Sequence, residues 1–187
     1  GPRVGVDAGF PRAELQLRPL VAADADEDAG AAVEQVVGGA AGVIALYAVG
    51  IALAMGAARV VFCASHAVQR EYAAALGAEV TAELAPDHGR FDVVVDACSD
   101  AAMLPATLRA AAPEAIVTSV SYYERDLVLS QRDLYFKGIT YRTGRPNVRT
   151  AMEPVLALCH SGAFKPQAVP QSVFVFDDAI EAWMSQE

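Results

Sequence analysis

The sequence predicts an α/β protein built on a doubly wound parallel sheet of the Rossmann type, with helices on both faces. Three observations indicate this class. From residue 33 onward short apolar runs alternate with helix-like segments, the runs are apolar at consecutive positions, and glycines cluster directly after the first run. Continuously apolar strands are typical of parallel sheets that are buried on both faces. Right-handed connections between such strands distribute the helices over both sides of the sheet.

The first two strand–helix units are expected to follow one another without interruption. The apolar run 33–38 predicts a strand, and the long apolar segment 43–55 predicts a helix that ends before a glycine. The run 59–63, RVVFC, predicts the second strand. The alanine-rich segment 67–76 predicts a second helix, because alanine favours helices and a glycine again follows the segment.

The middle of the chain continues the same alternation. A short strand is expected over 79–82, and a fully buried strand over 91–97, where the sequence reads FDVVVDA. A helix over 101–111 and a strand over 114–120 follow.

The last part of the domain is expected to contain the strand 139–141, a helix over 150–161, the strand 172–176 and a final helix from Asp177. The two aspartates at the start of this helix place negative charge at the positive end of its dipole.

The length of 187 residues predicts one domain with an appendage. Residues 1–32 show no clear period and contain prolines and an acidic patch, so a leader or a remnant of a preceding domain is expected there. Residues 33–187 then form the Rossmann domain.

The glycine cluster after the first strand has the composition of a phosphate-binding turn. Such a turn needs a tight bend, a residue without a side chain beneath the phosphates, and a small residue where the helix meets the sheet. Gly38, Gly39 and Gly42 meet the first two needs, and Ala45 meets the third. The helix N-terminus then presents N–H groups to an anion. A tight turn that binds no ligand is the alternative.

The end of the second strand bears on which dinucleotide is bound. Domains that bind NAD carry an acidic residue near this point, which accepts hydrogen bonds from the ribose hydroxyls. Here Ala64 takes that place, followed by Ser65 and His66. Ser65 is able to donate to a 2′-phosphate, and His66 (when protonated) and Arg70 offer positive charge, so NADP is favoured over NAD. A solvent-exposed turn without such a role is the alternative.

Several long segments resemble the coenzyme domain of the medium-chain, zinc-type alcohol dehydrogenase family. They read GAARVVFCASHAVQREYAAALGAEV, FDVVVDACSDAAMLPATLRAAAPEAIVTSV, LYFKGITYRTGRPNVRTAMEPVLALCHSGAFKPQAV and FVFDDAIEAW. The resemblance implies an NAD(P)-dependent exchange of hydride between an alcohol and a carbonyl compound. It places the pyrophosphate at the glycine loop and the adenosine ribose at the end of the second strand. Further cofactor contacts are implied at Ala97, Cys98, Ser119, Val120 and Ser121.

The resemblance also implies features that this sequence lacks. Members of the family bind a catalytic zinc with Cys, His and acidic ligands from a separate, preceding domain, but residues 1–32 contain no Cys or His. The three histidines, His66, His88 and His160, are scattered. We therefore expect a coenzyme domain without catalytic residues, without a metal site and without alcohol dehydrogenase activity of its own. The strand 139–141 matches the edge strand by which many members form homodimers.

Two alternatives remain open at this stage. An S-adenosylmethionine-dependent methyltransferase also has a doubly wound sheet and a glycine loop, but its last strand runs antiparallel. A non-catalytic module that binds a nucleotide weakly, or only packs against a partner, is the second. Arg145, in a Gly/Pro turn, could reach a phosphate or carboxylate or simply lie on the surface. The sequence does not identify the substrate.

Composition narrows the partners and the location. The net charge of -9 argues against binding to nucleic acid or to an anionic membrane. The apolar segment 43–55 is too short to cross a bilayer. Three separate cysteines, with no C-x-x-C pair, are typical of a cytoplasmic protein with reduced thiols.

Overall fold

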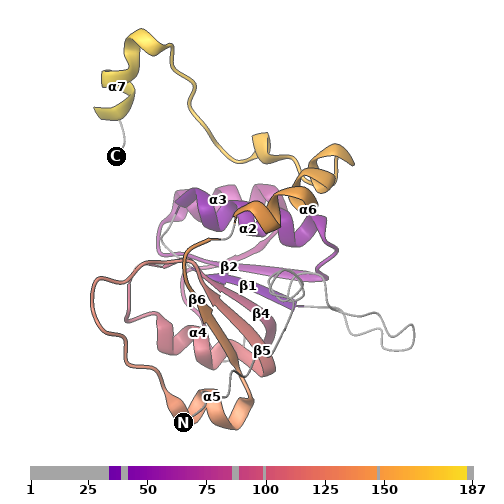
Figure 1. The fold of residues 1–187 in the computed structure, drawn as a ribbon, viewed down its shortest axis with the longest axis vertical. Helices are drawn as coiled ribbons and strands as arrows, with labels where there is room; N and C mark the ends of the chain where they lie inside the picture. The colour runs from indigo at the N-terminus through magenta and orange to yellow at the C-terminus, as the bar shows by residue number, and fades with distance from the viewer. Residues whose placement is uncertain (1–33, 39–41, 86–88, 99, 147, 185–187) are drawn as a thin grey trace, which may run out of the picture.

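The computed structural model describes residues 34–38, 42–85, 89–98, 100–146 and 148–184, with the strand 34–38 described in its backbone only. Between residues 34 and 160 the described strands and helices alternate, except that two strands follow one another within residues 79–96 (Figure 1). The elements are β1 (Glu34–Gly38), α2 (Gly42–Ala54), β2 (Arg59–Cys63), α3 (Ala67–Leu76), β3 (Glu79–Thr81), β4 (Phe91–Asp96), α4 (Leu104–Ala110), β5 (Ala111–Ser119), α5 (Gln131–Lys137), β6 (Thr140–Thr143), α6 (Val148–His160), α7 (Ala179–Met184) and the short 3-10 helices η2 (Pro166–Ala168) and η3 (Phe176–Asp178).

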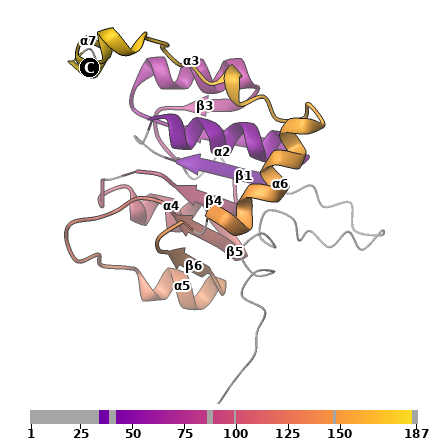
Figure 2. The same ribbon diagram turned by 45° about the horizontal axis from the view of Figure 1, so that its top comes forward.

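The strands form one six-stranded sheet in the order β3-β2-β1-β4-β5-β6, and neighbouring strands run parallel. Helices α2, α3 and α6 lie over one face, and α4 and α5 lie over the other (Figures 1 and 2). The predicted doubly wound Rossmann-type fold is therefore confirmed. Within the described residues, no helix is long and apolar enough to span a membrane.

The two faces of the sheet are buried against different helices. Along β2, Val60 and Phe62 contribute to the core beneath α2 and α3, whereas Val61 contributes to the core beneath α4. Successive side chains of a strand point to opposite faces, so a run of consecutive apolar residues is needed to fill both cores. This is why RVVFC and FDVVV are apolar without alternation.

Local signals at the helix ends explain most boundaries. Gly77 ends α3 in the left-handed conformation with φ 108°, and the N–H groups of Gly77 and Ala78 donate to the carbonyls of Ala74 and Ala73. This pairing satisfies carbonyl groups at the end of the helix. At α4 a lysine has the same function: Lys137 Nζ donates to the carbonyl oxygens of Leu108, Arg109 and Ala111 at 2.8–3.0 Å. Burial lowers the pKa of Lys137 there.

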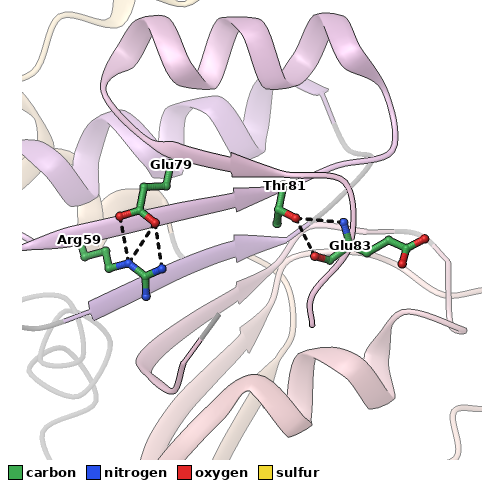
Figure 3. Close-up of polar contacts among 4 residues, drawn as sticks. All are labelled: Arg59, Glu79, Thr81 and Glu83. Atoms are coloured by element: carbon green, nitrogen blue, oxygen red, sulfur yellow. Dashed lines mark hydrogen bonds and ion pairs between the residues drawn. The ribbon is translucent and has the colours of Figure 1, made fainter. Parts of the chain in front are cut away.

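An ion pair joins the amino ends of β2 and β3 (Figure 3). Arg59 Nη2 lies 2.8 Å from Glu79 Oε2, and Arg59 Nε donates to both carboxylate oxygens of Glu79. The guanidinium also lies over the ring of Phe91, 5.4 Å from its centroid. At the other end of β3, the Thr81 hydroxyl donates to the Glu83 carbonyl at 2.7 Å as the chain leaves the sheet (Figure 3).

The structure corrects three expected elements. Residues 172–175 lie outside any strand, and η3 begins at Phe176, so the predicted strand 172–176 is wrong. Helix α4 begins at Leu104 and not at residue 101, because a turn closed by Asp100 precedes it. Strand β5 begins at Ala111, earlier than predicted, and accommodates a register shift opposite β4. Glu114, within that irregular stretch, has a φ of 61°.

Candidate functional site

The candidate site lies at the carboxyl edge of the sheet. Gly38 at the end of β1 is paired in register with Cys63 on one side and with Asp96 on the other. Asp96 is in turn paired with Ser119 of β5. The chain leaves β1 toward one face and β4 toward the other, so this is the switch point where doubly wound sheets bind ligands. The parallel topology thus brings the predicted residues at the four strand ends to one edge.

The turn between β1 and α2 retains the features expected of a phosphate-binding loop. Gly42 begins α2 with a φ of +50°, and a Cβ added there would meet no atom within 4 Å. Ala45 is fully buried in the core between α2 and the sheet, so it is the small residue at the helix–sheet contact. Gly38 ends β1, and Gly39 lies outside the described residues.

In the turn after β2, one side chain is less accessible than the sequence predicted. The Ala64 side chain is 4% exposed and belongs to the core beneath α2 and α3. A bound ligand therefore cannot reach that side chain, whereas Ser65 and His66 are exposed. Of the three residues expected at the adenosine ribose, only Ser65 and His66 therefore present side chains to solvent.

Arg70 brings positive charge to this same turn. Its Nη1 donates to the carbonyl oxygen of Ala64 at 2.6 Å and to that of Ser65 at 2.7 Å. The two bonds fix the guanidinium of an α3 residue directly against the turn between β2 and α3. An anionic group beside Ser65 would meet this guanidinium.

A buried carboxylate that the sequence analysis did not single out lies at the end of β4. Asp96 is 1% exposed; its Oδ1 accepts the Cys98 N–H at 3.1 Å, and its Oδ2 accepts the Tyr123 hydroxyl at 2.8 Å. Burial, together with this bond to Asp96, holds the pKa of Tyr123 well above its ordinary value. Buried carboxylates need such partners. Asp96 thus ties the segment after β5 to the segment after β4.

Of the residues implied after β4 and β5, most present buried side chains. Ala97, Cys98 and Ser119 are buried, whereas Val120 is 44% exposed. Within the described part of the chain, the Oγ atoms of Ser119 and Ser121 are buried without a hydrogen-bond partner. A ligand at this edge would therefore meet mainly backbone groups and the Val120 side chain.

The cysteines at this edge are not activated nucleophiles. Burial, with smaller contributions from Cys98 and Glu83, raises the pKa of the Cys63 thiol from 9.0 to about 11. Cys98 is buried, and its Sγ accepts the Asp100 N–H at 3.4 Å. Reactive cysteines need a lowered pKa and access to solvent. Both thiols are buried, so neither is accessible to a ligand in solution.

A cavity of about 390 Å³ opens beside the ends of β5 and β6. Its walls come from Ile44 in the first turn of α2, from Ser119 and Val120, and from the β6–α6 turn that contains Arg145. The size falls within the range of small-molecule sites. The structure thus adds a pocket at the point where the nicotinamide was expected.

No metal centre is found in the described ranges, where no group of three His, Cys, Asp or Glu side chains could hold an ion. His88 lies outside those ranges. The described residues therefore do not supply the three protein ligands that a catalytic zinc needs.

A six-stranded parallel sheet in this order, with a glycine turn leading into the helix after its first strand, defines a Rossmann-type domain. A family model described as "Zinc-binding dehydrogenase" matches residues 43–161. The chain belongs to this family, as the sequence resemblance predicted. No curated protein matches the chain.

Solved structures of similar fold include the alcohol dehydrogenase TADH from Thermus sp. ATN1, with 24% identity and a TM-score of 0.74 over 81% of this chain and 47% of that one. An alcohol dehydrogenase (rspB) from E. coli CFT073, complexed with NADH, has 18% identity and a TM-score of 0.73 over 82% and 48% of the two chains. A zinc-binding dehydrogenase from Sinorhizobium meliloti 1021, bound to NADP, has 21% identity and a TM-score of 0.56 over 72% and 43%. The chain spans about half the length of these proteins.

Proposed function

We propose that this chain is the NAD(P)-binding domain of an alcohol dehydrogenase-like oxidoreductase. The observation that carries the proposal is the switch point between β1 and β4, where Gly42 opens α2 and Ala45 packs against the sheet. The N–H groups of the first turn of α2 would bind the pyrophosphate. Relatives of the same fold bind NADH and NADP, which supports a nicotinamide cofactor.

The cofactor would supply the hydride chemistry, and this chain would bind and orient it. Ser65, His66 and the guanidinium of Arg70 would surround the adenosine ribose, and the backbone after β4 and β5 would contact the nicotinamide half. Val120 would shield one side of the ring. Oxidation of an alcohol, or reduction of a carbonyl compound, is proposed for the whole protein.

We propose NADP as the preferred form of the cofactor. An acidic residue beside the ribose would repel a 2′-phosphate, but Ser65 is neutral and lies against the Arg70 guanidinium. Titration of the protein with NADPH and NADH, followed by cofactor fluorescence, should give the lower dissociation constant for NADPH. Ser65→Asp should reverse this order. Equal dissociation constants for NADPH and NADH, in the wild-type protein and in Ser65→Asp alike, would refute the preference. Glu124→Gln, which changes a charge in an exposed loop, is the control.

The methyltransferase alternative is disfavoured because β6 runs parallel to β5. Titration with S-adenosylmethionine in the same assay tests this directly, and binding of that compound in preference to both dinucleotides would support the alternative. A protein that binds none of the three ligands would be the non-catalytic module considered above.

We further propose that the chain by itself has no zinc-dependent alcohol dehydrogenase activity. A catalytic zinc needs three protein ligands and one open position. An assay of the zinc-supplemented protein against primary and secondary alcohols with both cofactors should show no turnover. Turnover that a chelator abolishes would reveal a metal site in the chain.

Association through β6 is proposed as well. In the described sheet β6 lies at an edge, and Tyr135 and Phe136 on the preceding helix are 77% and 78% exposed. An edge strand beside exposed aromatic rings favours pairing with a second copy. Light scattering at tens of micromolar should give a dimer, and the paired change Tyr135→Ser, Phe136→Ser should weaken it. A monomeric wild-type protein would refute this.

The three unpaired cysteines favour a reducing compartment, so we propose the cytoplasm.

A further inference from the structure

We infer that the cavity beside β5 and β6 is an anion site in which Arg145 binds a phosphate or carboxylate group of a ligand. The inference rests on the proposed function, which locates the ligand at this edge of the sheet. The contact itself is not required for cofactor binding. It gives a function to the β6–α6 turn, which takes no part in the phosphate and ribose contacts proposed above.

The charge of this cavity is opposite to that of the protein. The chain carries a net charge of -9. Two arginines line the cavity, and none of its lining residues in the described ranges is Asp or Glu. The shallow groove along α6 contrasts with it, because Glu153 lines that groove beside Arg149. In an acidic protein, a concave site with guanidinium groups and no carboxylate in its wall favours an anionic ligand.

The chemistry of the remaining wall supports the same ligand class. Thr118, Thr143 and Thr150 line the cavity, and their hydroxyl groups are hydrogen-bond donors. Arginine presents a planar fork of N–H groups that matches the two oxygens of a carboxylate or phosphate. The nicotinamide ring is neutral when reduced and cationic when oxidised, so in neither state would it need such a set of groups.

The position of the cavity relates the anion to the rest of the site. Ile44 belongs to the first turn of α2, so the cavity adjoins the positive end of that helix dipole. Val120, which also lines the cavity, follows β5. An anion held here would lie beside both the first turn of α2 and the end of β5.

The β6–α6 turn holds Arg145 close to a fixed backbone conformation. Gly144 adopts a φ of +148°, and Pro146 restricts the residue that precedes it to extended conformations. Arg145 is exposed at the cavity rim. Restricting the backbone lowers the entropy that is lost when the side chain engages a ligand.

Two ligands carry the required group. One is the dinucleotide, through its phosphates, and the other is a small organic acid that serves as alcohol or carbonyl substrate. The volume of about 390 Å³ is near the lower end for ligand pockets, which suits half of a dinucleotide or a small hydroxy acid.

The test compares Arg145→Gln with Arg132→Gln, which removes the same charge from an exposed arginine on α5, on the opposite face of the sheet from α2 and α6 (Figure 2). Calorimetric titrations at fixed ionic strength use three probes: inorganic pyrophosphate, NADPH, and lactate added to protein saturated with the oxidised cofactor, NADP+. We expect Arg145→Gln to weaken at least one probe by about tenfold or more, and Arg132→Gln to change none by more than about twofold. Arg145→Lys should give an intermediate loss, because it keeps the charge but not the fork.

The pattern across the probes identifies the ligand. Equal losses for pyrophosphate and NADPH would assign the anion to the cofactor, and a loss for lactate alone would assign it to the substrate. If the wild-type protein binds pyrophosphate through Arg145 but fails to bind NADPH, the proposed function fails and the anion site stands. Identical affinities in both glutamine variants, or no binding of any probe to the wild-type protein, would overturn the inference.

Discussion

The sheet and the C-terminal arm, residues 170–184, are both rich in large apolar side chains, but they bury them to opposite extents. Phe62 and Phe91 in the sheet are 0% exposed, whereas Phe176 and Trp183 in the arm are 91% and 76% exposed. After α6 the chain runs away from the sheet and ends in α7 (Figure 1). The arm approaches the body at Val43 and Tyr47 of α2, across a cavity of about 650 Å³.

The difference shows that an apolar sequence pattern alone does not determine whether its side chains become buried. The arm sequence SVFVF has the composition of a strand, and FDVVV in β4 has the same character. β4 pairs with β1 and β5, which satisfy its backbone groups. Since no strand in the described sheet pairs with 172–175, those residues stay outside the sheet.

The largest expected difference between the two regions is in the stability lost when one phenylalanine of each is replaced by alanine. Phe91→Ala should cost about 3–5 kcal/mol of unfolding free energy, because the ring is fully buried. Phe176→Ala should change it by less than about 0.5 kcal/mol. Urea unfolding followed by circular dichroism measures both. Comparable losses would show that the arm is packed as firmly as the sheet.

A second change probes the contact where the chain leaves the body. A Cβ added at Gly50 would lie 2.8 Å from Cε2 of Phe164, whose ring also meets Tyr47 edge-on at 6.2 Å. Gly50→Ala should destabilise the protein by about 1–2 kcal/mol, since overpacking costs about 1–3 kcal/mol and the better helix propensity returns up to about 1 kcal/mol. Adding Phe164→Leu should recover part of the loss. A stabilised single variant would mean that the Phe164 ring moves freely.

The smallest expected effect is a pH dependence of the unfolding free energy that arises from Cys63 in β2. Burial raises the pKa of Cys63 from 9.0 to about 11. The unfolded chain therefore releases this proton first, so the contribution of Cys63 to stability is present below pH 9 and is lost as the pH rises toward 11. The urea midpoint of Cys63→Ala should fall less steeply over this interval than that of the wild-type protein. The same slope in Cys63→Ala and in the wild-type protein would contradict the assignment to Cys63.

Most of the fold could be predicted because its signals are local. The strand 59–63 and the helix 67–76 match the structure residue by residue, since consecutive apolar residues and a terminal glycine define them without reference to the rest of the chain. The strand 172–176 failed because pairing needs a neighbour, and a sequence pattern does not reveal whether one exists.

The candidate site could be predicted only in outline. The strand ends were located correctly because parallel topology determines their common edge. The burial of Ala64 could not be read from its neighbours, and the role of Asp96 depends on Tyr123, 27 positions away in the chain. One signal was present, since Asp96 falls on the same strand face as Val94 and is expected to be buried.

The bond between Asp96 and Tyr123 has a consequence for the connection from β5 to α5, which runs over residues 120–130. The bond anchors the connection at Tyr123, close to the end of β5. The residues next to the strand end are thus held by the protein itself, without the help of a ligand. A ligand that settles there would lose little affinity to ordering the protein, and its residence time would depend on the contacts themselves.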